Sequence, residues 1–158
     1  MFRELVRKQQ ALSHEECLAL LRQEKRGVLS VQGDDGYPYG MPMNHFYCDE
    51  DGAIYFHCGK VGHRLDALRR CGKVSFCVFD GGEPIPGNWA LRVKSVIVFG
   101  QIEILDDRSL VVDISEKLCR KFTEDETYIQ NEIRQFAAAT LLLRLTPEHI
   151  CGKLVKES

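Results

Sequence analysis

Residues 53–72 read AIYFHCGKVGHRLDALRRCG, and the pattern changes from a strand to a helix inside this stretch. From residue 54 to residue 57, purely apolar side chains alternate with polar ones, which is the two-residue period of a half-buried strand. Beyond Arg64, leucines and an alanine recur at helical spacing. The change of period therefore falls in the short glycine-containing segment between the two.

This strand-to-helix junction has the composition of a phosphate-binding loop. Gly59 and Gly62 can adopt positive φ, and the first turn of the next helix offers unpaired N–H donors and a positive dipole end. Lys60, His63 and Arg64 add positive charge, and the Arg64 guanidinium can bind a phosphate with two parallel hydrogen bonds. The segment matches neither a Walker loop nor GxGxxG. An ordinary surface connection between a strand and a helix remains the alternative.

Length and composition limit the classes of protein that this chain can be. With 158 residues, a single domain spanning residues 1–158 is expected. The chain has 21 basic and 23 acidic residues, so it lacks the basic excess with which proteins hold nucleic acid. No apolar run approaches the length of a membrane span, and the first ten residues lack the core of a secretory signal. We therefore predict no nucleic-acid partner, no membrane association and a cytoplasmic location.

The seven cysteines do not form a disulfide or metal pattern. Their number is odd and no CxxC pair occurs, so reduced thiols that act as small apolar side chains are expected. His57 and Cys58 are neighbours on a strand and point to opposite faces, which prevents a closed tetrahedral site. The sequence therefore predicts no metal site.

The N-terminal part predicts a helix followed by a hairpin. Ser13 and Glu16 have the S-x-x-E spacing of a capping box, so a helix is expected from residue 13 to about residue 25, before Gly27. A strand follows, and the sequence GDDG at 33–36 carries the Asp-Gly signal of a tight turn.

The second strand of this hairpin is expected over residues 37–48. Pro38 and Pro42 make it an edge or bulged strand, and the backbone groups that it leaves unpaired can bond to a planar heterocycle. One face carries the side chains Tyr37, Tyr39, Met41, Met43, His45 and Tyr47. This face suits a plain protein core equally well, so both interpretations stay open.

A short apolar strand is expected over residues 73–79, followed by a loop over 80–88 with three glycines and two prolines. Trp89, the only tryptophan, either covers a ligand or closes one end of the core, and we favour the core. Residues 91–105 form the longest strand pattern. Its two faces are both apolar, and the face that carries Ile97 and Phe99 needs a further partner, which a homodimer interface would supply.

The last third of the chain predicts two helices and two strands. Helices are expected from residue 106 to 122 and from residue 125 to 139, and a final pair of short strands over 141–145 and 150–155. Five to seven short antiparallel strands with helices inserted between them indicate a mainly β, α+β fold, a small barrel with peripheral helices.

Four segments of the chain resemble a known family. They are the capped N-terminal helix that begins at Ser13, DGYPYGMPMNHFY at 35–47, DGAIYFHCGKVGHRLDALRRCGKVSF at 51–76 and KSVIVFGQIEIL at 94–105. The chain resembles the FMN-binding split barrels related to pyridoxamine 5'-phosphate oxidase, and within them the nitroimidazole-resistance-like proteins. The resemblance runs from Ser13 to Lys153 and implies a six-stranded antiparallel split β-barrel with peripheral helices.

The resemblance also implies a cofactor site, because the family binds FMN across a homodimer. Met41, Pro42, Met43 and Asn44 match the strand along the isoalloxazine edge, His57 and Cys58 flank the flavin and its phosphate tail, and His63 and Arg64, with Lys60 and Gly62 beside them, match the phosphate site. Lys94 and Ser95 match positions that approach the flavin from the other subunit. His63 stands where a permanently charged residue is usual.

The resemblance points to an FMN-dependent oxidoreductase that reduces a small electron acceptor such as a nitroaromatic. His57 is predicted to face the flavin and relay a proton to the substrate. The oxidase's C-terminal Trp and Arg segment has no counterpart after Lys153, so oxidation of pyridoxamine phosphate is not expected. A nicotinamide reductant, NAD(P)H, would visit only transiently. The alternative is a non-catalytic flavin or haem module, with His45, His57 and His63 as candidate haem ligands.

Overall fold

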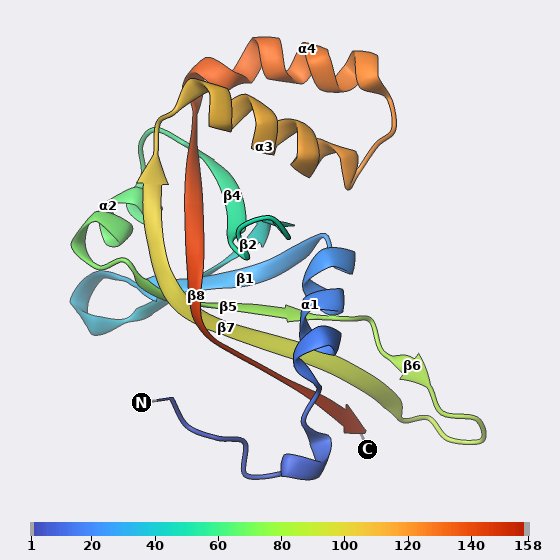
Figure 1. The fold of residues 1–158 in the computed structure, drawn as a ribbon. Helices are drawn as coiled ribbons and strands as arrows, with labels where there is room; N and C mark the ends of the chain where they lie inside the picture. The colour runs from blue at the N-terminus through green and yellow to red at the C-terminus, as the bar shows by residue number, and fades with distance from the viewer. Residues whose placement is uncertain (1, 157–158) are drawn as a thin grey trace.

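The computed structural model describes residues 2–156, in which one antiparallel sheet curls into a partial barrel (Figure 1). The strand order is β2-β1-β5-β7-β8-β4-β3, and β6 pairs with β7 outside this path. The strands are β1 (Arg26–Gln32), β2 (Pro38–Asn44), β3 (Phe46–Tyr47), β4 (Ile54–Gly59), β5 (Lys73–Phe79), β6 (Glu83–Pro84), β7 (Leu91–Leu105) and β8 (Thr140–Lys156). Six of these are long, so the predicted six-stranded split barrel with peripheral helices is confirmed.

Four α-helices surround the sheet: α1 (His14–Gln23), α2 (His63–Arg70), α3 (Arg108–Arg120) and α4 (Glu126–Phe136). Short 3-10 turns lie at Lys8–Gln10, Asp34–Gly36 and Ala137–Ala139. Helices α3 and α4 form a hairpin over one end of the sheet, whereas α2 lies at the side (Figure 1). Over the described residues, no helix has the length and apolar character needed to cross a bilayer.

A bent strand joins the two edges of the sheet. β2 pairs with β1, and β3, which follows after a single residue, pairs with β4. That residue is His45, which is 0% exposed. Its Nε2 donates to the carbonyl of Leu21 at 2.8 Å, and its backbone N–H donates to Lys25 at 3.3 Å. The predicted strand at 37–48 is therefore an edge strand, interrupted at a buried corner.

Two hydrophobic cores lie on either side of β4. The larger fills the barrel and includes Ile54 and Phe56, and the smaller lies beneath α3 and α4 and includes Tyr55. Tyr55 is only 3% exposed, because the helical hairpin covers the outer face of the strand. The prediction that this strand is half-buried is therefore wrong for residues 54–56.

The predicted pair of short C-terminal strands is a single strand of 17 residues, β8. The TPEH sequence at 146–149 does not end the strand, because a β-bulge accommodates it: Phe99 faces His149, whereas Gly100 faces Pro147. A Cβ atom at Gly100 would lie 2.2 Å from the carbonyl oxygen of Thr146, so the close approach at the bulge requires glycine.

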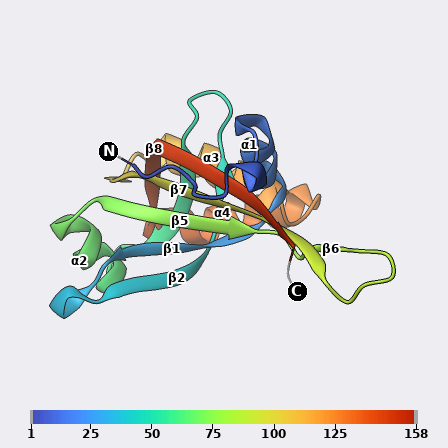
Figure 2. The same ribbon diagram turned by 90° about the horizontal axis from the view of Figure 1, so that it is seen from below.

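The predicted loop at 80–88 contains the two residues of β6, so residues 80–90 form a small hairpin with the start of β7. This hairpin projects beyond the rest of the sheet in both views (Figures 1 and 2). Trp89 lies in its turn and is 80% exposed, so the expectation that it closes the core is wrong. The core ends before the hairpin, and no element of the described chain covers Trp89.

Candidate functional site

The junction between β4 and α2 is an open loop. β4 ends at Gly59, and α2 begins at His63. Gly62 is the N-cap residue, with φ 127° and ψ 168°, a region that favours glycine. Of the two glycines predicted to adopt positive φ, only Gly62 does so. No side chain caps the helix, so its first N–H groups remain available.

Five consecutive amides are unpaired in this loop. Among the described residues, no acceptor takes a hydrogen bond from the backbone N–H groups of residues 60–64, and Leu65 is the first to bond, to the carbonyl of Gly62 at 3.0 Å. The loop surrounds a cavity of about 220 Å³, lined also by Tyr39 and Cys58. Amide donors and a positive helix end around an open cavity are suited to an anion.

The three predicted basic residues of the loop differ in their partners. Lys60 forms an ion pair with Asp106 at 3.3 Å, and His63 approaches Asp34 at 3.2 Å. The Arg64 guanidinium, in contrast, has no acidic partner in the part of the chain that the structure describes. Its Nε donates to Met41 Sδ at 2.9 Å.

The His63 ring has a second contact that fixes its position. It stacks on the ring of Tyr39, with centroids 4.4 Å apart and an interplanar angle of 11°. Asp34, from the turn between β1 and β2, also accepts from Arg70 at 2.6 Å. Sequence reasoning took the acidic residues of this turn only as turn formers, and nothing in the local sequence shows that Asp34 reaches α2.

The predicted flavin strand, residues 41–44, presents two different faces. Met41 and Met43 point into the barrel and are 5% and 6% exposed. Pro42 is exposed and lies with Arg26 and Phe79 along a shallow depression of about 500 Å³. Asn44 accepts a hydrogen bond from Arg26 Nε at 2.8 Å. The structure thus brings Met41 to the loop between β4 and α2, through Arg64, and places Pro42 on the outside of the barrel.

His57 and Cys58 lie on opposite faces of β4. The half-buried Cys58 packs against the barrel core and lines the loop cavity; burial raises the pKa of its thiol, and the nearby Arg64 charge opposes this. His57 shares the face of Tyr55 and lines a second cavity, beneath α3 and α4. Loss of hydration there, and then the Arg64 charge, lower the pKa of His57. This lowering favours the neutral form of the imidazole.

Lys94 and Ser95 lie far from the loop within one chain. Both belong to the start of β7, and the loop residue Lys60 contacts Asp106, just beyond the other end of that strand. Asp106 lies eleven positions after Ser95, which corresponds to about 36 Å along the strand. A single chain therefore does not bring Lys94 and Ser95 to the loop between β4 and α2.

The histidines considered as haem ligands do not share a site. His45 is buried with its Nε2 engaged, and His57 and His63 line different cavities. Residues 2–156 contain no group of three or more His, Cys, Asp or Glu side chains placed to hold a metal ion.

The fold and the loop together define a class of protein: antiparallel split barrels with an uncapped helix N-terminus beside the barrel edge. Residues 13–154 match the family model described as pyridoxamine 5'-phosphate oxidase, and the chain belongs to this family. The resemblance inferred from the sequence is thus confirmed. No curated protein sequence matches the chain.

Solved structures with the same fold include three that are similar over most of this chain. A candidate 5-nitroimidazole antibiotic resistance protein from Bacteroides thetaiotaomicron is 19% identical, with a TM-score of 0.77 and coverage of 92% of this chain and 87% of that one. An FAD-binding protein from Mesorhizobium loti is 24% identical, with a TM-score of 0.66 and coverage of 92% and 97%. A flavocytochrome from Azotobacter vinelandii is 16% identical, with a TM-score of 0.74 and coverage of 99% and 75%. At these identities the likeness establishes the fold.

Proposed function

We propose that the protein binds FMN and acts as an oxidoreductase that reduces a small electrophile such as a nitroaromatic. The observation that carries the proposal is the row of five unpaired amides at residues 60–64, beside the Arg64 guanidinium, which has no acidic partner among the described residues. The family supports a phosphorylated ligand, and the flavin-binding proteins among the similar folds support a flavin.

The loop suits the terminal phosphate of FMN for chemical reasons. A phosphate monoester carries nearly two negative charges and accepts several hydrogen bonds, which amide donors and a guanidinium can supply together. Gly59 and Gly62 leave space here, because a Cβ atom added to either would meet no other atom within 4 Å. Arg64 would bind the phosphate, and Lys60, already paired with Asp106, would contribute less.

The flavin ring would extend from the loop towards the edge strand β2, along the backbone of residues 41–44. Lys94 and Ser95 would complete the site only from a second copy of the chain, because about 36 Å of strand separates them from the loop of their own copy. We therefore include a homodimer in the proposal.

The outer face of the sheet is a suitable dimer surface. Cys77, Ile97 and Cys151 form one half-buried row across β5, β7 and β8, and Phe79 is 56% exposed near it. The ring of Phe2 covers part of Phe99, at a centroid distance of 5.5 Å. Ile97 therefore offers more apolar surface to a second copy than Phe99 does. Light scattering at micromolar concentration should report a dimer, and a monomer would remove this part of the proposal.

Bound flavin would supply electron transfer, one or two electrons at a time. Reduction of a nitro group also consumes protons, and His57 would relay one as a neutral imidazole. Since His57 lines the cavity beneath α3 and α4, this role requires the electrophile to reach that cavity. A nicotinamide reductant would approach the flavin only transiently.

Absorbance spectra of protein purified without added cofactor test the proposal. We expect flavin bands in the blue and near ultraviolet, and release of FMN upon denaturation. A Soret band would indicate the haem alternative. Anaerobically reduced protein mixed with a nitroaromatic should reoxidise faster than free reduced FMN at the same concentration. Equal rates would mean that the protein binds flavin but does not catalyse the reaction.

A further inference from the structure

The hairpin of residues 80–90 forms an arm whose shape is set by its own polar groups. At its base, the Asp80 carboxylate accepts from the backbone N–H of Lys94 at 3.0 Å, and the backbone N–H of Asp80 donates to the Lys94 carbonyl at 3.1 Å. In its turn, the Asn88 side-chain oxygen accepts from the N–H of Ala90 at 3.1 Å. The arm is therefore preformed where it projects beyond the sheet (Figures 1 and 2).

The arm presents a large aromatic side chain to solvent. Trp89 is 80% exposed, whereas the neighbouring Ala90 is 0% exposed. A tryptophan that packs against another surface buries roughly 150–250 Å², and tryptophan is enriched among the residues that dominate binding energy in interfaces. An exposed tryptophan on a preformed arm is therefore suited to contact a second molecule.

A continuous apolar row crosses the outer face of the sheet and extends the proposed dimer surface. Side chains that lie opposite each other in neighbouring strands share one face. In register across β8, β7, β5, β1 and β2, the row consists of Cys151, Ile97, Cys77, Val28 and Pro42. None of these five side chains is buried. The dimer surface therefore continues as far as the edge strand β2.

The β2 end of this row is the depression of about 500 Å³ beside Pro42. Val28 and Phe79 also line this depression. Phe79 is the last residue of β5 and directly precedes the arm. Because the arm and the depression adjoin on one chain, a two-fold axis that passes beside Phe79 places each arm against the depression of the other copy.

The arm and the depression carry opposite charge. Asp80 and Glu83 are the only charged residues among 80–90, so the arm is acidic. Lys25, Arg26 and Glu24 line the depression, so positive charge predominates there. Opposite charges favour contact between an arm and a depression, whereas two arms would repel each other.

We propose that Trp89 of each copy packs into the depression beside Pro42 of a second copy of this chain. The proposed flavin ring lies along residues 41–44, which include Pro42, so Trp89 of the second copy borders the ring. The contact rests on the proposed homodimer, and its role at the ring rests on the proposed FMN site. It adds to that site a residue which a single chain cannot supply.

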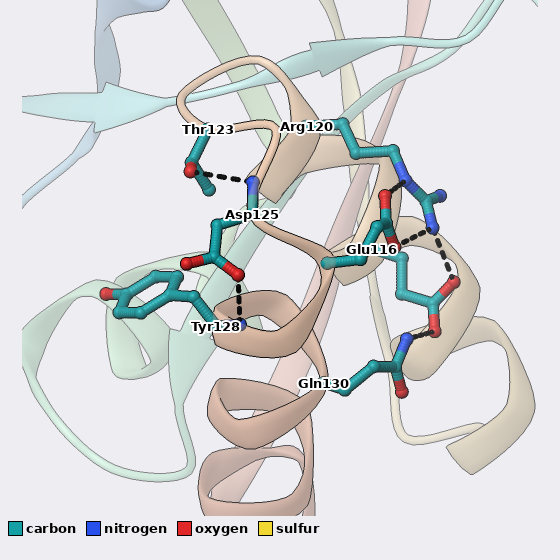
Figure 3. Close-up of polar contacts among 7 residues, drawn as sticks. Glu116, Arg120, Thr123, Asp125, Tyr128 and Gln130 are labelled. Atoms are coloured by element: carbon teal, nitrogen blue, oxygen red, sulfur yellow. Dashed lines mark hydrogen bonds and ion pairs between the residues drawn. The ribbon is translucent and has the colours of Figure 1, made fainter.

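Analytical ultracentrifugation without FMN tests the contact. Trp89→Ala should weaken the dimer at least tenfold. Tyr128→Ala is the matched control, because Tyr128 is also an exposed aromatic residue on a hairpin, at 53%. Its ring points away from the ion pairs of Arg120 with Glu116 and Glu126 (Figure 3). Tyr128→Ala should leave the dimer affinity unchanged.

Tryptophan fluorescence follows the same contact, because Trp89 is the only tryptophan in the chain. Its emission should shift to shorter wavelength as the parent protein is concentrated and the dimer forms. Pro42→Asp places a charge in the depression at an exposed position, so it should abolish this shift without unfolding the chain. With FMN bound, Trp89→Ala should raise the flavin fluorescence, because contact with an indole ring quenches it.

The possible outcomes separate this inference from the proposed function. A parent dimer with constant Trp89 emission, whose affinity is unchanged by Trp89→Ala, would overturn the arm contact and leave the homodimer in place. A monomeric parent would overturn both. Equal flavin fluorescence in the parent and Trp89→Ala would remove Trp89 from the flavin site. A parent that dimerises through Trp89 but binds no FMN would contradict the proposed function and the role at the ring, and would leave the arm contact standing.

Discussion

The N-termini of the four helices differ in how their first amides are satisfied. α1 begins with a complete capping box, in which Ser13 accepts from Glu16 and Glu16 accepts from Ser13. α3 and α4 begin with Asp107 and Asp125, each of which accepts from a backbone N–H three residues ahead at 3.0 Å. α2 begins with Gly62 and has no side-chain cap. A cap contributes about 1 kcal/mol, so α2 forgoes stability that the other helices have, and its amides stay free for a ligand.

The largest effect is expected on FMN affinity, from a substitution at the uncapped N-terminus of α2. Arg64→Glu removes a guanidinium that has no acidic partner among the described residues and adds repulsion, so FMN affinity should fall by about 2–5 kcal/mol, or about 30-fold to several thousandfold. The fluorescence of added FMN measures the change.

Arg69→Glu provides the matched control, because Arg69 lies on the same helix but points to solvent near Asp66. Its FMN affinity should stay within a few fold of the parent. Equal losses in the two variants would mean that α2 acts only through its general charge.

The next largest effect is expected at His45, in the buried corner between β2 and β3. Burial, with a smaller contribution from the Lys121 charge, lowers the pKa of His45 from 6.5 to about 4. Between these values the unfolded chain binds the proton more readily, so stability is lost as pH falls from 6.5 to 4, by about 3 kcal/mol in total. Urea denaturation at pH 7.0 and pH 4.5 should show this loss.

His45→Gln can keep the hydrogen bond to Leu21 without the titration, so it should reduce the acid sensitivity. His14→Gln, at an exposed position, should retain the parent's pH dependence. A His45→Gln variant as acid-sensitive as the parent would show that the corner is not the cause.

A third expectation separates binding from turnover. His57 lies outside the phosphate loop, so His57→Phe should retain FMN. Reoxidation of the reduced protein by a nitroaromatic should slow about 100-fold, the usual scale for loss of a general acid. Stopped-flow absorbance measures the rate. Normal flavin content together with a normal rate would assign His57 a structural role.

A substitution at Gly62 tests whether the uncapped N-terminus of α2 depends on the backbone conformation of this residue. At φ 127° and ψ 168° an alanine is strained, although its Cβ would meet no atom within 4 Å. Gly62→Ala should therefore cost about 1–3 kcal/mol, in stability or in FMN affinity. Gly59→Ala, where φ is not positive, should cost less in stability. Thermal melts with and without FMN compare the two variants.

The smallest effect belongs to a capped helix. Asp125→Ala removes the cap of α4 and should lower the free energy of unfolding by about 1 kcal/mol. FMN affinity should not change, because Asp125 caps the start of α4 and does not line the loop cavity. Urea denaturation and an FMN titration on the same sample measure both quantities. A large loss of FMN affinity would mean that the N-terminus of α4 influences ligand binding at the N-terminus of α2.

Local signals predicted much of this molecule. The capping box placed α1, the change of period placed α2, and the apolar pattern of residues 91–105 matched β7 to the residue. These features depend on neighbours in the chain, so a sequence contains them directly. The uncapped, glycine-led start of α2 was also visible in the sequence.

Features that depend on distant partners were not predicted. The ion pairs of Lys60 with Asp106 and of His63 with Asp34 join different elements, and without them the three basic residues look equivalent. The bulge at Gly100 lets β8 continue past Pro147, which reads locally as a strand break. The cavity beneath α3 and α4 could not be predicted from the sequence, because it forms only when the α3–α4 hairpin folds onto β4.

The central claim is that the open end of α2 holds the phosphate of FMN, and parallel NMR titrations with FMN and riboflavin test it most directly. Riboflavin has the same ring system but lacks the phosphate. The account predicts that FMN binds far more tightly and shifts the backbone amide signals of residues 60–64, whereas riboflavin leaves those signals in place. Equal affinities for the two ligands, with the amides of residues 60–64 unmoved by FMN, would contradict it.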